Sequence, residues 1–211
     1  MSELNSLNQE NQNLIELNVL EKYFKPIKPH SRAAYKMAAA VQFFQLQLQD
    51  KVCADFGANS GGFTAIMLNC GAEKVYAVET GYGLLDWTLR QNQKVICMER
   101  TNAMRVSLPE KVDLISIDTS WTKQKNILPN ALNNLRDNGI IITLIKPHYE
   151  IDNQRDLRQG HVPDELIPRI LEKVRTEIES LELKILGECV SPIAGKSGKN
   201  IEHLWLLRKN I

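Results

Sequence analysis

Short hydrophobic segments alternate with helical segments through the middle of the chain, and this alternation constrains the fold more than any other feature. Runs rich in β-branched or aromatic residues predict strands at 52–56, 75–78, 95–98, 114–117 and 140–145. Helical segments are predicted between strands at 64–70, 83–90 and 127–135. Strands that alternate with helices pair in parallel and are covered on both faces. The pattern therefore predicts an α/β fold built on a mostly parallel sheet.

The flanking segments extend this prediction. A helix is predicted over 32–48, with Ser31 as its N-cap, because apolar residues recur there at roughly helical spacing. The clearest amphipathic pattern predicts a helix over 164–181, and two last strands are predicted at 183–190 and 201–207. A chain of 211 residues has enough apolar residues for one hydrophobic core but not for two. We therefore expect a single folded domain over residues 31–211.

Residues 1–30 have a different composition. The first twenty are polar and lack aromatic residues, which is typical of a mobile tail or a weak helix. A basic stretch follows, in which Pro26 and Pro29 favour an extended backbone. Its positive residues are Lys22, Lys25, Lys28, His30, Arg32 and Lys36. We interpret residues 1–30 as a polar tail and a basic extended arm.

Charge and cysteine content exclude several classes of protein. The formal net charge is +1, so any contact with RNA must be a local patch of basic residues. The four cysteines, Cys53, Cys70, Cys97 and Cys189, lack the spacing of a zinc site and predict free thiols. No run of apolar residues is long enough to span a membrane, and the N-terminus has no export signal. We expect a protein of the reducing cytoplasm.

A glycine-rich turn, DFGANSGGFT at 55–64, follows the first predicted strand. It lacks the Gly-x-Gly-x-x-Gly spacing of a dehydrogenase, which disfavours that chemistry. Glycines still allow a backbone to approach a ligand closely, and the following helix offers free N–H groups to a carboxylate. The turn therefore suits an amino-acid moiety, although similar turns occur in many proteins without a cofactor.

Two further residues extend the predicted ligand site. Glu79 ends the second strand, where a carboxylate can accept hydrogen bonds from both hydroxyls of a ribose. Asn102 follows the third strand and could hydrogen-bond an adenine edge. S-adenosylmethionine carries both an amino-acid carboxylate and an adenosine, so it matches the turn and these two side chains together.

Other short motifs follow in order along the chain. They are SRAAYK at 31–36, VYAVETGYG at 75–83, ERTN at 99–102, IKPHYE at 145–150 and NIE at 200–202. With GANSGGFT at 57–64, they resemble the FtsJ-related ribosomal RNA 2'-O-methyltransferases, and most closely the hemolysin-A-like (TlyA) branch. The likeness covers residues 31–207, which is nearly all of the chain beyond the tail.

The resemblance implies a Rossmann-like class I S-adenosylmethionine-dependent methyltransferase, with a seven-stranded mostly parallel sheet and an antiparallel last hairpin. It implies S-adenosylmethionine as the donor, S-adenosylhomocysteine as the product, no metal, and methylation of a ribose 2'-hydroxyl of ribosomal RNA. The Lys-Asp-Lys-Glu catalytic tetrad of the family falls on Lys36, Asp118, Lys146 and Glu202. The cofactor-binding residues are then expected to be Gly57, Asn59, Ser60, Gly61, Gly62, Phe63, Glu79, Thr101, Asn102 and Asp118.

The chain departs from the branch in three places. The motif at 31–36 is closer to the FtsJ form, since the hemolysin-like proteins usually have two glycines after the Arg. Glu79 stands where an Asp is commoner, a change of one methylene that should preserve ribose binding. The tail of this chain is too short and too polar to be the small RNA-binding module that usually precedes the catalytic domain in that branch. A protein partner that supplies RNA targeting is therefore one expectation.

Methyl transfer to a ribose hydroxyl requires in-line positioning and a group that makes the hydroxyl nucleophilic. Lys146 is the candidate for this role. A general base must be a neutral amine, whereas an unperturbed lysine has a pKa near ~10.4, so burial and nearby positive charge would have to lower it. Alternatively, a charged lysine stabilises the developing oxyanion while the proton is lost to water. The residues alone leave both roles open.

Each tetrad residue also has an ordinary structural reading. Asp118 could cap the following helix, and Lys146 could extend to solvent beyond an apolar strand. Glu202 could face outward from the last strand, and Lys36 could be a solvated helix charge. Their joint occurrence near one edge of the predicted sheet favours the catalytic interpretation.

The substrate side is less defined. Basic residues in predicted loops could follow RNA phosphates around the pocket, namely Lys123, Lys125, Arg155, Arg158, Lys196 and Lys199. The segment 191–199 is predicted to be a substrate flap before Glu202. Two rival functions remain: methylation of a non-RNA substrate, or a non-catalytic module that binds the cofactor or RNA during ribosome assembly.

Overall fold

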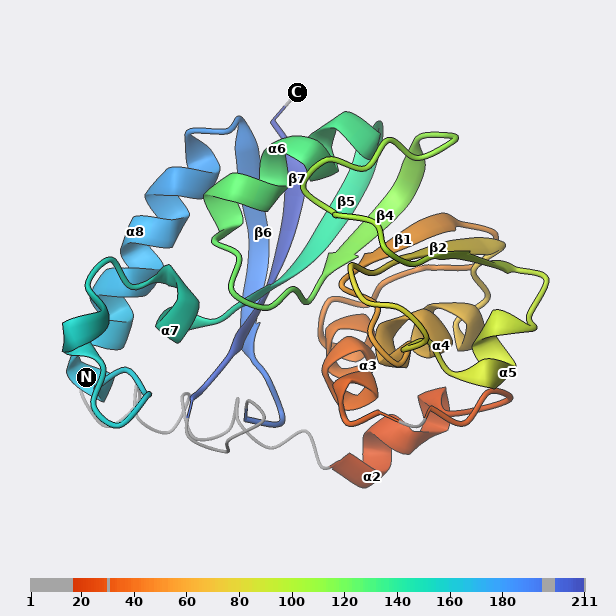
Figure 1. The fold of residues 1–211 in the computed structure, drawn as a ribbon, viewed down its shortest axis with the longest axis horizontal. Helices are drawn as coiled ribbons and strands as arrows, with labels where there is room; N and C mark the ends of the chain where they lie inside the picture. Colours follow the sequence, from red (N-terminus) through yellow and green to blue (C-terminus); the bar gives the residue numbers. More distant parts are fainter. Residues whose placement is uncertain (1–16, 30, 195–199, 211) are drawn as a thin grey trace.

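The computed structural model describes residues 17–29, 31–194 and 200–210, which form a single seven-stranded sheet covered by helices on both faces (Figure 1). The strand order is β3-β2-β1-β4-β5-β7-β6. The strands are β1 Val52–Phe56, β2 Lys74–Val78, β3 Val95–Met98, β4 Val112–Ile117, β5 Leu135–Ile145, β6 Leu183–Val190 and β7 His203–Lys209. Strands β1 to β5 pair in parallel, whereas β7 pairs antiparallel with both β5 and β6. This confirms the predicted fold class, including the antiparallel last hairpin.

The helices divide the hydrophobic core into two layers. The α-helices are α2 Leu17–Leu20, α3 Ala33–Phe43, α4 Gly62–Asn69, α5 Trp87–Arg90, α6 Gln124–Asn134, α7 Pro147–Glu150 and α8 Ile167–Glu179. Short 3-10 turns lie at Glu21–Tyr23, Gln154–Asp156 and Asp164–Leu166. One layer includes Met37 of α3 and Ile66 of α4, and the other includes Leu128 of α6 and Val174 of α8. Both faces of the parallel strands are therefore buried, which explains their continuous apolar runs.

Several element boundaries differ from those predicted. The helix predicted over 32–48 ends at Phe43, because Gln45 adopts a left-handed φ of 51° and Leu46 N donates to Val41 O. Only Trp87–Arg90 of the segment 83–90 is helical, because the N–H groups of Leu84 and Leu85 donate to the Glu99 carboxylate instead. The segment 164–181 begins with a 3-10 turn, and its α-helix ends at Glu179.

The last strand also starts later than predicted. It begins at His203 instead of residue 201, so Glu202 precedes β7 and does not lie within it. The outward-facing position suggested for Glu202 is wrong, since its exposed fraction is 3%.

The basic arm is docked on the core more closely than its composition indicates. Leu20 is fully buried, and Phe24 and Ile27 pack against the layer that contains α3 and α4. Asn69 holds the arm through three hydrogen bonds, donating to Tyr23 O and Ile27 O and accepting from Ile27 N. The arm was predicted to be extended, but it begins with the 3-10 turn at Glu21–Tyr23. Residues 1–16 of the predicted tail, and His30, lie outside the described residues.

Within the described ranges, no helix is long and apolar enough to cross a membrane. All four cysteines are free thiols; Cys53 is buried and the other three are half-buried.

A buried carboxylate joins the sheet to the glycine-rich turn. Asp55, at the end of β1, accepts hydrogen bonds from Thr64 N (3.0 Å), Thr64 Oγ1 (2.7 Å) and Ser116 Oγ (2.9 Å). Its exposed fraction is 1%, and this burial raises the pKa of Asp55 to about 6, although the hydrogen bonds oppose the shift. The three bonds fix the start of α4 against β1 and β4.

This geometry predicts a pH-dependent stability contribution from Asp55. Because its folded-state pKa is above the value near ~3.9 of an unfolded aspartate, the folded state binds the extra proton, and the stabilisation is lost as pH rises through about 6. A shift of this size corresponds to about 3 kcal/mol. Asp55→Asn does not ionise; its Oδ1 can accept both bonds from Thr64, while its Nδ2 can donate to Ser116 Oγ in the reversed direction. Its free energy of unfolding should therefore exceed that of the wild type increasingly from about pH 4 to about pH 7.

Urea unfolding of both proteins across this range measures the difference. Asp137→Asn, which changes a side chain that is 92% exposed, is the matched control and should leave the pH slope of the wild type unchanged. Parallel stability curves for Asp55→Asn and the wild type would contradict the prediction.

Candidate active site

The predicted tetrad comes together at the carboxyl edge of the sheet. Asp118 directly follows β4, and Lys146 directly follows β5, which is its neighbour in the sheet. Lys36 lies on α3, and Glu202 lies just before β7. Two adjacent parallel strands, a helix and the antiparallel hairpin therefore each contribute one charged side chain.

The four side chains form a continuous chain of ion pairs. Lys146 Nζ lies 2.6 Å from Asp118 Oδ1, and Lys36 Nζ lies 3.5 Å from Asp118 Oδ2. Lys36 Nζ also lies 2.6 Å from Glu202 Oε2. Lys146 Nζ donates a further hydrogen bond to Thr119 O at 2.9 Å. Two positive and two negative groups thus neutralise each other within one cluster.

These groups are largely removed from solvent. Lys36 and Lys146 are each 8% exposed and Glu202 is 3% exposed, which contradicts the alternatives of solvated lysines and an outward glutamate. Asp118 does not cap the next helix, since no side chain caps α6. Burial acts to raise the pKa of Asp118, but Lys146 and Lys36 together hold that pKa below its usual value. The carboxylate is therefore ionised at neutral pH and can anchor both ammonium groups.

A cavity of about 220 Å³ opens beside Asp118 at the ends of β1, β2 and β4. Its walls include the predicted cofactor-binding residues Gly57, Asn59, Glu79, Thr101, Asn102 and Asp118. The other residues that line this cavity were not predicted from the sequence; they are Val78, Thr80, Ala103, Met104, Thr119, Ser120, Thr122 and Ile127. Most of these residues lie in the loops directly after strand ends, and that position was the signal that could have found them.

A second cavity of about 410 Å³ adjoins the first, since both are lined by Gly57, Asn59, Asp118 and Ser120. It contains Lys36 and the predicted residues Ser60, Gly62 and Phe63. Gly61 lines neither cavity. It caps α4 with a φ of 87°, and a Cβ there would lie 2.2 Å from Leu89 Cδ1, so the position serves the packing of the turn.

Glu79 holds the turn as well as lining the first cavity. Its Oε2 accepts from Asn59 N at 3.0 Å, and its Oε1 accepts from Gly81 N at 2.8 Å and from Thr80 Oγ1 at 3.0 Å. A carboxylate has about four acceptor positions, so the bonds leave Oε2 able to accept another donor from the cavity.

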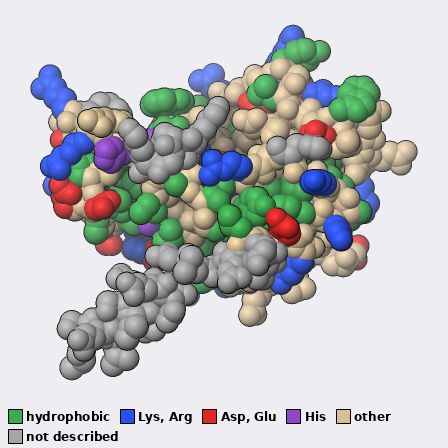
Figure 2. Space-filling view, turned by 90° about the horizontal axis from the view of Figure 1, so that it is seen from below, with side chains coloured by type: hydrophobic (Ala, Val, Ile, Leu, Met, Phe, Trp, Pro, Cys, Tyr) green, Lys and Arg blue, Asp and Glu red, His purple; other side chains and the backbone are tan. Residues whose placement is uncertain are grey.

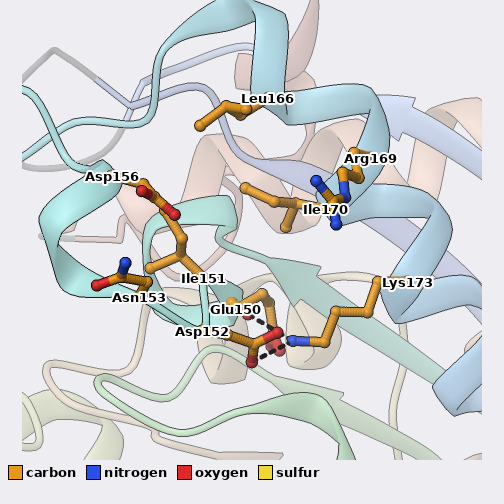
Figure 3. A pocket seen from close by; sticks show the side chains of 9 residues that line it. All are labelled: Glu150, Ile151, Asp152, Asn153, Asp156, Leu166, Arg169, Ile170 and Lys173. Atoms are coloured by element: carbon orange, nitrogen blue, oxygen red, sulfur yellow. Dashed lines mark hydrogen bonds and ion pairs between the residues drawn. The ribbon is translucent and has the colours of Figure 1, made fainter.

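Lys146 is held in place by the short helix that follows it. Tyr149 N donates to Lys146 O at 2.8 Å, and Glu150 Oε1 accepts from Gln124 N of α6 at 2.9 Å. Burial raises the pKa of Glu150 to about 7. Behind α7, a separate cavity of about 320 Å³ lies against α8, where Lys173 Nζ bonds both Asp152 Oδ1 and Glu150 O (Figure 3). These contacts brace the Lys146 segment against two helices.

Comparisons with known proteins show the family of the chain. The family model of the FtsJ-like methyltransferases matches residues 29–208. The 16S/23S rRNA (cytidine-2'-O)-methyltransferase TlyA of Mycobacterium tuberculosis is 35% identical over 182 residues, which are 83% of this chain and 67% of that protein. Hemolysin A of Brachyspira hyodysenteriae is 33% identical over 183 residues, which are 84% of this chain and 76% of that protein.

Solved structures show the same likeness. The crystal structure of a hemolysin from Lactococcus lactis superposes with a TM-score of 0.81 at 31% identity, covering 87% of this chain and 90% of that one. An S-adenosylmethionine-dependent methyltransferase structure from Listeria monocytogenes, at 15% identity and a TM-score of 0.63, shares the fold. The family match over residues 29–208, together with the relatives, establishes that this chain belongs to the FtsJ-like methyltransferases.

Proposed function

We propose that this protein transfers a methyl group from S-adenosylmethionine to a ribose 2'-hydroxyl of ribosomal RNA, with Lys36, Asp118, Lys146 and Glu202 as its catalytic tetrad. The observation that carries the proposal is the buried chain of ion pairs beside two adjoining cavities. The names of the relatives support the substrate, since TlyA of M. tuberculosis is an rRNA (cytidine-2'-O)-methyltransferase. We assign residues 31–211 to the methyltransferase domain.

The residues of the first cavity fit the cofactor. The remaining acceptor position of Glu79 would take a ribose hydroxyl, and Thr101 and Asn102 would lie along the adenine. The turn at Gly57 would lie against the amino-acid part, and the absence of a Cβ on Gly57 lets this turn pack directly against the backbone of Asp118. When bound, S-adenosylmethionine supplies an electrophilic methyl group on its sulfonium.

The geometry of Lys146 explains how one side chain could serve either of two roles. Its Nζ donates to Asp118 Oδ1 and to Thr119 O. A neutral amine has two N–H groups, so both could be used in this way while the lone pair faces the substrate hydroxyl. A charged ammonium has a third N–H, which would instead stabilise the developing oxyanion. Both roles need the same anchors, Asp118 and Thr119.

Lys36 and Glu202 act on Asp118 in this proposal. Lys36 bridges the two carboxylates, at 2.6 Å from Glu202 Oε2 and 3.5 Å from Asp118 Oδ2. The bridge holds Asp118 oriented with its other oxygen toward Lys146. Lys36 and Asp118 also line the second cavity, in which a substrate ribose would lie.

An exposed aromatic ring that packs near a half-buried one beside the tetrad favours a nucleic-acid substrate. Trp121, three residues after Asp118, is 80% exposed, and its ring centroid lies 4.9 Å from that of Tyr149. Tyr149 in turn lies near the tetrad, because Lys146 Nζ is 5.4 Å from its ring centroid. Proteins bind unpaired RNA bases by stacking them on such rings. A small metabolite enclosed in the second cavity would not require this exposed surface.

We expect Lys146→Ala to lower the rate of methyl transfer by about 10²-fold or more while leaving cofactor affinity close to that of the wild type. The assay follows radiolabelled methyl groups from S-adenosylmethionine to purified ribosomal subunits and naked ribosomal RNA, followed by nucleoside analysis. Lys111→Ala, an exposed lysine ahead of β4, is the matched control and should transfer normally.

Lys146→Arg separates the two roles. Arginine keeps the positive charge but does not accept a proton at accessible pH, so partial activity supports oxyanion stabilisation and none supports a base. Absence of label from every RNA with wild-type protein, despite cofactor binding, would overturn the RNA substrate; label on metabolites would then identify a non-RNA enzyme. Normal methyl transfer by Lys146→Ala would refute the catalytic role of the tetrad. The role of a protein partner in RNA targeting stays a prediction.

The glycine turn offers an independent test of the cofactor site. Gly57 has a φ of 89°, and a Cβ there would lie 2.6 Å from Asp118 O, which is backbone and cannot move without displacing the tetrad. Gly57→Ala should therefore weaken S-adenosylmethionine binding by about tenfold or more. This loss of affinity is separate from the backbone strain of a left-handed alanine, which costs roughly 1–2 kcal/mol. Gly160 has a similar φ of 83° with nothing within 4 Å of a Cβ, so Gly160→Ala isolates the strain.

Isothermal titration calorimetry of both glycine variants measures the cofactor affinity. Equal affinity in Gly57→Ala and Gly160→Ala would show that the turn does not contact the cofactor.

A further inference from the structure

A fourth cavity lies beside the active site, along the basic arm. It has a volume of about 640 Å³ and lies between the arm and α3, with walls at Glu21, Phe24, Lys25, Pro26, Lys28, Pro29, Ser31, Arg32 and Tyr35. Ser31 and Arg32 also line the cavity that contains Lys36 and Asp118. The two cavities therefore adjoin at Ser31 and Arg32, and we call the surface that they line, from the tetrad outward over the arm, the groove.

Three positive side chains line this groove and have no ion-pair partner among the described residues. Lys25, Lys28 and Arg32 are exposed, and none forms an ion pair with any residue in the described part of the chain. The acidic wall residue, Glu21, lies at the start of the arm, where its Oε1 accepts from the Tyr35 hydroxyl at 3.1 Å. The view from below, on the side where α2 lies, shows Lys and Arg side chains together with some acidic ones around an apolar area (Figure 2). The local group of Lys25, Lys28 and Arg32 is invisible in the net charge of +1.

Three of the other basic residues that the sequence suggested for phosphate contact form ion pairs within the protein, whereas Arg155 is exposed and has no ion pair among the described residues. Lys123 pairs with Asp152 at 2.8 Å, and Lys125 pairs with Glu177 at 3.3 Å. Arg158 lies 3.2 Å from Glu165, and Lys196 and Lys199 lie outside the described residues. Among the described residues, the arm is therefore the segment whose unpaired basic side chains line a cavity next to the site, since Arg155 lines none of the cavities beside the tetrad.

The arm is also held in a fixed position. Asn69 binds its backbone at Tyr23 and Ile27 on both sides of Lys25, and Phe24 packs edge-on against Tyr35 with ring centroids 4.8 Å apart. A binding surface that is already ordered loses less conformational entropy when a ligand binds. The two lysines are thus presented by a preformed scaffold.

We propose that this groove binds the phosphate backbone of single-stranded RNA adjoining the target nucleotide, with Lys25 and Lys28 on the phosphates and Arg32 at the junction with the active site. The inference rests on the proposed RNA methyltransferase function and specifies where the substrate strand lies. Unpaired cations along a groove that leads to the reacting ribose match a polyanion in sequence-independent contact. The charge complementarity and the continuity of the two cavities together select RNA as the occupant.

The test compares three full-length proteins: the wild type, Lys25→Ala/Lys28→Ala, and Lys94→Ala/Lys111→Ala. The second pair removes the same charge from exposed lysines just before β3 and β4, at the edge of the sheet opposite the site. Fluorescence anisotropy with a short labelled oligouridylate gives Kd at several salt concentrations. Calorimetry gives the affinity for S-adenosylmethionine, and methyl transfer to naked ribosomal RNA gives KM.

We expect the arm variant to reduce the slope of log Kd against log salt by about 1.4, since each phosphate contact on a single strand contributes roughly 0.7. Its KM for RNA should rise while its affinity for S-adenosylmethionine stays at the wild-type value. The control variant should keep the wild-type slope and KM.

Equal slopes and equal KM values for the two double variants, with an active wild type, would overturn the groove and leave the methyltransferase function standing. A wild type that neither binds the oligonucleotide nor labels ribosomal RNA would overturn both. Loss of cofactor affinity in the arm variant would also count against the groove, because it would place the effect in the cofactor site.

Discussion

The pairing of one buried carboxylate with two lysines is the constraint on which the site depends. Asp118 is ionised because Lys146 and Lys36 outweigh the effect of its burial. A buried charge without such partners is strongly unfavourable, so each member of the cluster needs the others to be present. The surrounding structure can therefore be understood as the framework that brings four charged groups within contact distance of one another.

The topology of the sheet provides that framework. Parallel strands place their carboxyl ends at one edge, which brings Asp118 and Lys146 side by side after β4 and β5. The antiparallel strand β7 lies next to β5, and the residue that precedes it, Glu202, reaches the same edge. Asp55 and Glu79 then fix the glycine-rich turn at the end of β1, so that the cavity proposed for the cofactor opens beside the tetrad.

The segment ahead of the sheet extends this arrangement toward a substrate. Docking of the arm on the core, through Leu20 and Asn69, aligns its lysines with the cavity that contains Lys36. The exposed ring of Trp121 packs near the half-buried ring of Tyr149, which lies beside Lys146 of the tetrad. Separate surfaces would then contact the cofactor, the reacting ribose, a neighbouring nucleobase and the phosphate backbone of the RNA. All of these surfaces adjoin the buried charges.

The sequence by itself determined the α/β class, the strands and the identities of the four charged residues, because hydrophobic periodicity and short motifs are local properties of the chain. The helix that ends at Phe43 was predicted to be longer, because a left-handed residue and hydrogen bonds outside the helical pattern determine where a helix ends. Only the tertiary structure decided that Lys36 and Glu202 are buried and paired, since they are far apart in sequence. It also decided which basic residues remain unpaired, because ion pairs such as Lys123 with Asp152 join separate elements, and no local pattern records them.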